Sequence, residues 1–166
     1  MQQDSTRRGN ASLPDLRWVA PAQGTLKIYV DASVIKGANF FSVGMVARDH
    51  QGLFMRGKTM KFAGQVSVLE AKMVGILEAL IWFSDLPDQS IIVESDSMLS
   101  IQAITKAEHN QLEIGNLIEQ CLVKRRGVGA LLYAPSYHPS RIHAWAASEA
   151  VRLGVCDTYF KVQTFS

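Results

Sequence analysis

The chain has 166 residues, of which 48% are hydrophobic and 19% are charged. This length suits one domain, and the composition excludes general disorder because the chain has enough apolar side chains to bury a core. The net charge of +2 neither requires nor excludes a polyanionic partner.

Cysteine content and hydrophobic runs bear on the compartment. Cys121 and Cys156 match no paired metal-ligand spacing and are too few for a disulfide framework. We therefore expect a reducing intracellular compartment, nuclear or cytoplasmic, with an organelle left open. No apolar run approaches the roughly 18 residues of a membrane-spanning helix, and residues 1–10 lack the hydrophobic core of a secretory signal. The sequence thus predicts a soluble protein without a membrane partner.

The domain boundaries follow from where apolar residues begin and end. Residues 1–24 are rich in Gln, Ser, Arg, Gly, Asn and Pro with few apolar anchors, which predicts a flexible tail. The folded domain is expected over residues 25–156. Residues 157–166 form a C-terminal extension whose structure the sequence leaves unassigned.

The first half of the domain has the period of strands. From Thr25, apolar and polar residues alternate with a period of two, and Asp31 lies at the carboxyl end of this first strand. Two more strands are predicted over Phe41–Asp49 and Leu53–Lys61, joined by short polar turns. Three successive strands with short turns predict an antiparallel meander.

The second half alternates between helices and strands. Apolar residues recur at helical spacing after Ser67, and the stretch from Ser67 to Glu70 has the form of a capping box. The apolar run Ile91–Val93 predicts a central strand, closed by Asp96. The remaining predicted elements are helices over Ser97–Lys106, Glu113–Arg126 and Ser140–Gly154 and a strand over Ala130–Tyr133.

This order of elements predicts an α/β fold. Its sheet is expected to be mixed and five-stranded, with a three-strand antiparallel meander plus two parallel strands, and to be flanked by helices. In such a sheet, ligands gather beyond the carboxyl ends of the strands. Asp31, Glu70 and Asp96 are expected to converge there, and carboxylate oxygens are the ligands that Mg²⁺ prefers. The three residues are therefore a candidate metal site.

Each of these carboxylates also has a purely structural explanation. Asp96 is suited to cap the following helix, Glu70 to be the reciprocal residue of the capping box, and Asp31 to be a solvated strand end. Their joint placement is what favours a site.

Four segments together resemble the ribonuclease H domain of plant retroelements and their plant relatives: LKIYVDAS at Leu26–Ser33, VGMVARDHQG at Val43–Gly52, SVLEAKMVGILEAL at Ser67–Leu80, and IIVESDSMLSIQAI at Ile91–Ile104. The resemblance covers roughly residues 17–154. It implies a ribonuclease H fold and divalent-metal-dependent cleavage of the RNA strand of an RNA–DNA hybrid. It also implies Mg²⁺ as cofactor, with Mn²⁺ as a substitute.

The resemblance assigns site residues one by one. Asp31, Glu70 and Asp96 align with three of the family's four metal-binding carboxylates, and the fourth position is Ala144, which cannot ligate a metal. His143 is next to this position. Because adjacent helical residues point about 100° apart, His143 would need a shifted helix register to take the place of the missing carboxylate. His138 occupies the loop where related enzymes keep a mobile histidine, although a loop histidine beside Pro139 is more often merely exposed.

Basic residues suggest where a nucleic acid would lie. Lys124, Arg125 and Arg126 form the densest basic cluster, and Arg48 adds a further candidate contact to a phosphate backbone. Cations at the end of a helix also complement the helix dipole, so a purely structural role for the cluster stays open.

Two hypotheses about function follow. The first is an RNase H-type endonuclease, weakened by Ala144, that uses Asp31, Glu70 and Asp96 to bind Mg²⁺. The second is a catalytically impaired module that keeps the fold and binds nucleic acid or a protein partner, because a fold does not by itself specify a function. The oligomeric state is left open.

Overall fold

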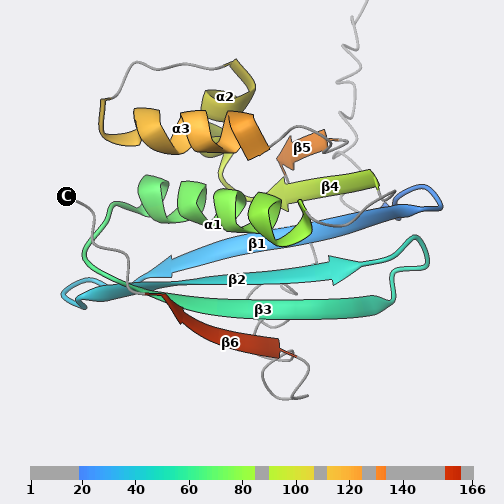
Figure 1. Ribbon diagram of the computed structural model, residues 1–166, viewed down its shortest axis with the longest axis horizontal. Coiled ribbons are helices and arrows are strands. Elements are labelled where there is room, and N and C mark those ends of the chain that lie inside the picture. The colour runs from blue at the N-terminus through green and yellow to red at the C-terminus, as the bar shows by residue number, and fades with distance from the viewer. Residues whose placement is uncertain (1–18, 85–89, 107–111, 125–129, 134–155, 162–166) are drawn as a thin grey trace, which may run out of the picture.

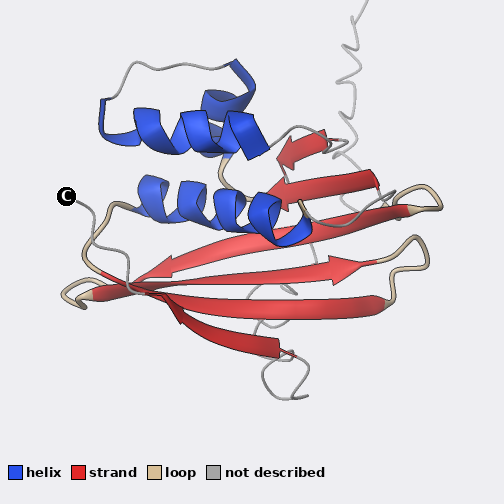
Figure 2. Cartoon of the chain, viewed as in Figure 1, coloured by secondary structure: helices blue, strands red, loops and turns tan. Residues whose placement is uncertain are grey.

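The computed structural model describes residues 19–84, 90–106, 112–124, 130–133 and 156–161. These residues form the strands and helices drawn in Figures 1 and 2. In chain order they are β1 (Thr25–Val34), β2 (Phe40–Arg48), β3 (Phe54–Ala63), α1 (Val68–Phe83), β4 (Ser90–Ser95), α2 (Met98–Lys106), α3 (Leu112–Lys124), β5 (Ala130–Tyr133) and β6 (Cys156–Lys161).

The strands form one mixed sheet in the order β5-β4-β1-β2-β3-β6. β1, β2 and β3 pair antiparallel, which confirms the predicted meander, and β4 lies parallel to β1. β5 in turn pairs in parallel with β4. The expected count of five strands is not confirmed, because β6 pairs in parallel with β3 and adds a sixth strand. β6 begins at Cys156 and extends into the segment that the sequence left unassigned, since only a tertiary contact supplies its partner.

The alternation predicted for the first strand places its apolar side chains in the core. Leu26, Ile28 and Val30 belong to one hydrophobic cluster with residues of α1 and of the neighbouring strands. α1 packs on β1, β2 and β4, and α3 packs against α1 (Figure 1). The predicted helix Ser140–Gly154 lies outside the described residues.

The other face of β1 has polar residues that are nonetheless buried. Lys27 forms an ion pair with Glu94 of β4 at 2.8 Å and donates a hydrogen bond to the carbonyl oxygen of Val19 at 2.6 Å. This contact attaches the segment before β1 to the sheet, and Pro21 within that segment is buried. Among the described residues, none of the helices is long and apolar enough to cross a membrane.

The capping box at the start of α1 is confirmed. The Ser67 hydroxyl accepts a hydrogen bond from the Glu70 backbone N–H at 3.2 Å, and the Glu70 carboxylate accepts one from the Ser67 backbone N–H at 2.7 Å. Both groups satisfy helix-terminal N–H donors that have no partner within the helix. The start of α1 is therefore set by its own sequence.

Candidate functional site

The register of two parallel strands brings Asp31 and Asp96 together. Val30 of β1 and Ser95 of β4 are the last residue pair between these two strands. The residues that follow them in the chain therefore lie beside each other. These two residues are Asp31 and Asp96. The prediction that these two carboxylates meet is confirmed, but Asp31 lies within β1, where it pairs with Gly44 of β2, and not at the end of the strand.

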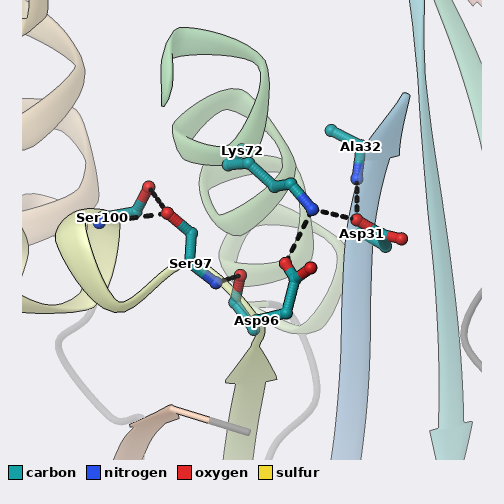
Figure 3. A network of polar contacts seen from close by, with 7 residues as sticks. Asp31, Ala32, Lys72, Asp96, Ser97 and Ser100 are labelled. Carbon is teal, nitrogen blue, oxygen red and sulfur yellow. Dashed lines mark hydrogen bonds and ion pairs between the residues drawn. The ribbon is translucent and has the colours of Figure 1, made fainter. Parts of the chain in front are cut away.

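A lysine joins the two aspartates. The Lys72 Nζ of α1 donates a hydrogen bond to Asp31 Oδ1 and another, of 2.7 Å, to Asp96 Oδ1, as Figure 3 shows. The Lys72 side chain is 13% exposed, while those of Asp31 and Asp96 are 33% and 21% exposed. One ammonium group therefore neutralises part of the charge of two half-buried carboxylates that come from different strands.

The packing of α1 explains why Lys72 reaches this position. Gly75 lies against β1 and β2: a Cβ there would lie 3.0 Å from a Val30 methyl and 3.4 Å from a Val43 methyl. Residues three apart share a helix face, so Lys72 lies on the same side of α1, one turn nearer the helix start. α1 begins at the end of the sheet where β1 ends (Figure 1), and from its first turns the Lys72 Nζ contacts Asp31.

The electrostatics of Lys72 reflect two opposing effects. Burial by itself lowers the pKa of an amine, because it disfavours the charged form. Hydrogen bonds and charge attraction from Asp31 and Asp96 outweigh that effect, so the pKa of Lys72 lies above its ordinary value of 10.5. Lys72 is therefore a fixed cation at neutral pH.

Local hydrogen bonds hold Asp31 and the residues on either side of Asp96. The Ala32 backbone N–H donates to Asp31 Oδ1 at 2.7 Å (Figure 3). After Asp96, the Ser97 backbone N–H donates to Ser95 Oγ at 3.3 Å, and the Ser97 and Ser100 hydroxyls lie 2.7 Å apart. The Ser97 hydroxyl also accepts from the Ser100 N–H at 3.2 Å, which makes Ser97, and not Asp96, the side chain that caps α2.

The expectation that Glu70 joins the two aspartates is wrong. Its carboxylate is bound to the Ser67 backbone in the capping box. Successive helical residues are about 100° apart, so Glu70 and Lys72 point about 200° apart, and Lys72 is the one that faces the aspartates. In this structure the Glu70 carboxylate belongs to the capping box, and its role as a metal ligand stays a prediction.

The residues at this centre do not fit the divalent ions that the resemblance implies. The described part of the chain contains no group of three His, Cys, Asp or Glu side chains that could hold a metal ion. Mg²⁺ requires oxygen ligands at about 2.0–2.1 Å in a near-octahedral shell. A protonated lysine has only donors and repels a second cation. Lys72 thus occupies the position between the aspartates where such an ion would have to bind.

Sequence reasoning missed Lys72, although a signal for it was present. Lys72 is two positions after Glu70 in the same helix, and it is the charged residue of the otherwise apolar stretch Ala71–Leu77. A charge among buried helical positions requires a partner. Since Glu70 was already accounted for by the capping box, that requirement pointed to Lys72 as the residue facing the carboxylates.

The other predicted site residues lie apart from this centre or outside the described residues. Arg48 donates a hydrogen bond to the Gly52 carbonyl at 2.8 Å and so stabilises the turn between β2 and β3. Its partner in the register is Lys27, four residues before Asp31, or about 13 Å along β1. Lys124 is exposed at the end of α3. Arg125, Arg126, His138, His143 and Ala144 lie outside the described residues.

Comparisons with known proteins agree on the class of fold. A family model described as reverse transcriptase-like matches residues 30–123. RNase H1 from the halophilic archaeon Halobacterium salinarum superposes with a TM-score of 0.64 at 18% identity, covering 77% of this chain and 98% of its own. The N-terminal RNase H domain of a Mycobacterium tuberculosis protein gives 0.60 at 14% identity, with 78% and 98% covered.

A third similar structure contains a nucleic acid. LC11-RNase H1, solved in complex with an RNA/DNA hybrid, gives a TM-score of 0.61 at 16% identity, with 78% of this chain and 99% of its own covered. No curated protein sequence matches the chain. Identities this low describe a shared fold and leave the chemistry to the residues of the site.

Proposed function

Because this chain belongs to the reverse transcriptase-like family and has an RNase H-like fold, we propose that it binds RNA–DNA hybrids without hydrolysing them. The observation that carries the proposal is the Lys72 ammonium hydrogen-bonded to both Asp31 and Asp96. A hybrid is the ligand we favour because LC11-RNase H1, which has this fold, was solved with one. Duplexes of this kind are recognised by shape, phosphates and 2′-hydroxyls, none of which requires a catalytic metal.

Hydrolysis needs more than the aspartate pair provides. In RNase H-type chemistry, divalent ions stabilise the attacking and leaving oxygens of the phosphodiester. Asp31 and Asp96 face a lysine, and Glu70 is engaged in the capping box. A lysine ammonium has one positive charge and no open coordination position, so it cannot take over that role.

Hybrid cleavage with Mg²⁺ or Mn²⁺ is the second candidate function. It is favoured by one specific observation, the placement of Asp31 and Asp96 side by side, directly after the last residue pair between β1 and β4. Cleavage would require the Lys72 ammonium to leave both carboxylates. A third ligand would then have to come from outside the described residues.

The experiment uses a fluorescently labelled RNA–DNA hybrid of about 20 base pairs with double-stranded DNA and double-stranded RNA as competitors. Binding is measured by anisotropy in EDTA and in Mg²⁺ or Mn²⁺, and cleavage is followed on denaturing gels. We expect binding in EDTA that is at least as tight as in Mg²⁺, and no cleavage. An Asp31→Asn variant is the control.

Two outcomes would overturn the proposal in different ways. Cleavage by the unmodified protein that is lost in Asp31→Asn would establish the nuclease instead. If the protein binds none of the three duplexes, binding of a protein partner is the remaining hypothesis for its function.

A further inference from the structure

The space between Asp31 and Asp96 is a cation site already occupied by a group of the chain itself. Two carboxylates that meet at the ends of adjacent parallel strands repel each other unless a cation lies between them. In this protein the cation is the Lys72 Nζ, which contacts one oxygen of each. We propose that Lys72 is a tethered counter-ion in the place of a divalent metal, and that it covers a latent divalent-cation site which a carboxylate at position 72 opens.

The charge balance explains why the tethered cation excludes a metal. Asp31 and Asp96 contribute two negative charges and Lys72 one positive charge, so the group retains one negative charge. A divalent ion would have to displace an ammonium that is covalently held beside both carboxylates. It would also leave the positive charge of Lys72, whose side chain is only 13% exposed in the ion-paired structure, close to the incoming ion. Both effects weaken metal binding.

The geometry of α1 explains why position 72 controls the site. The capping box holds the start of the helix, and the contact of Gly75 with Val30 sets its distance from β1. The backbone at residue 72 is thus placed by both neighbouring turns. A carboxylate at this position would join Asp31 and Asp96, whereas the carboxylate of Glu70 points about 200° away.

This inference concerns the same site as the proposed function and deepens it. Its test, however, needs no nucleic acid, because metal binding is measured on the folded protein alone. A protein that binds no duplex can still have a tethered counter-ion, and a protein that binds hybrids can lack one. The two proposals therefore fail separately.

The experiment compares the unmodified chain with Lys72→Glu and Lys72→Gln. Mn²⁺ binding is measured by calorimetry and by the loss of the free Mn²⁺ resonance signal, and thermal unfolding is followed with increasing Mn²⁺ or Mg²⁺. We expect no saturable binding and an unchanged Tm for the unmodified chain. Lys72→Glu should bind Mn²⁺ at least about tenfold more tightly, with a Tm that rises with metal concentration.

Two control variants separate the site from general charge effects. Lys36→Glu makes the same change in charge at an exposed turn and should behave like the unmodified chain. Asp31→Asn added to Lys72→Glu should abolish the gained binding, because it removes one ligand of the opened site.

The outcomes decide the proposal even where a variant folds poorly. If Lys72→Glu folds only in the presence of Mn²⁺, the latent site is supported. If it is unfolded under both conditions, Lys72→Gln decides, since removing the ammonium alone should produce measurable Mn²⁺ binding. The proposal is overturned if the unmodified chain binds Mn²⁺ as tightly as the variants, or if no folded variant gains binding.

Discussion

Lys72 is the residue on which both proposals depend, and its contribution to folding is a separate question. Its ammonium is partly desolvated, which costs free energy, and it is compensated by two carboxylates. Removing the ammonium would leave the two carboxylate charges without a compensating positive charge. The stability of this end of the sheet should therefore respond to position 72 more than to exposed lysines.

We predict that Lys72→Met destabilises the protein by about 1–3 kcal/mol at neutral pH and low salt, between the values typical of exposed and buried ion pairs. The loss arises because Asp31 and Asp96 then repel each other without an intervening cation. Urea denaturation measures it, and added salt should reduce it because the carboxylates are partly exposed. Lys72→Arg, which keeps the charge, should lose less. An unchanged stability of Lys72→Met would mean that the ion pair contributes nothing to folding.

A second residue makes stability depend on pH. Cys121 of α3 is fully buried, and this burial raises the pKa of its thiol from an ordinary 9.0 to about 12. Above pH 9 the unfolded chain releases a proton that the folded protein keeps. We predict that stability falls as the pH rises from 9 toward 12, by up to roughly 1.4 kcal/mol per pH unit from this group.

Urea denaturation at pH 8, 9 and 10 tests this prediction in the unmodified chain and in Cys121→Ala. The variant has lower stability throughout because of the cavity it creates, so the slope with pH is the quantity to compare. The slope should be shallower in Cys121→Ala. Equal slopes would show that the alkaline loss comes from other groups.

At the scale of elements, α1 is defined by its first turn and by its contact with the sheet. The capping box is local, since Ser67 and Glu70 satisfy each other's backbone N–H groups. We predict that Ser67→Ala destabilises the protein by about 1 kcal/mol, whereas Ser67→Thr, which keeps the hydroxyl, has a smaller effect. Chemical denaturation is the measurement. Equal losses in the two variants would exclude the cap as the cause.

The contact of α1 with β1 and β2 depends on Gly75. Alanine is the better helix former by about 1 kcal/mol, but its Cβ would lie 3.0 Å from the buried, stiff side chain of Val30. We predict that Gly75→Ala lowers the free energy of unfolding by about 1–2 kcal/mol, because the cost of overpacking exceeds the gain in helix propensity.

A matched variant isolates the steric part of this prediction. Gly115 of α3 has nothing within 4 Å of the position its Cβ would occupy. Gly115→Ala should therefore stabilise the protein by roughly 0.5–1 kcal/mol. If both substitutions stabilise by the same amount, the close approach at Gly75 is not a constraint.

At the scale of the whole molecule, the low net charge of +2 limits how strongly the chain attracts a polyanion. Several described cations are also engaged within the fold: Arg48 with the β2–β3 turn, and Lys61 over the Phe40 ring at 3.7 Å. Lys124 at the end of α3 is exposed. Hybrid binding should thus depend on few phosphate contacts.

We predict that the logarithm of the hybrid association constant falls linearly with the logarithm of salt concentration, by about 0.9 per phosphate contact as for duplex DNA. Lys124→Ala should reduce the steepness of this slope by about 0.9, the contribution of one phosphate contact, while Lys36→Ala should leave it unchanged. Anisotropy titrations over a range of salt concentrations measure both slopes. An unchanged slope in Lys124→Ala would remove Lys124 from the interface.

How much of this protein the sequence determined depends on the range of the interactions involved. Periods of two and 3.6 residues predicted the meander and the three described helices, and the capping box at Ser67 was evident from four adjacent residues. Asp31 and Asp96 were identifiable because each follows an apolar strand segment in the sequence, although Asp31 lies within β1 in the structure. All of these features follow from neighbours in the chain.

Contacts between distant segments decided the rest. Three features are properties of the assembled sheet. They are the pairing of β6 with β3, the register that sets Asp31 beside Asp96, and the face of α1 that packs on β1. Glu70 and Lys72 are both charged residues in the first turns of one helix. The capping box, a local feature of the sequence, accounts for the position of the Glu70 carboxylate. The packing of α1 on the sheet, in which Gly75 lies against Val30, turns Lys72 toward the aspartates.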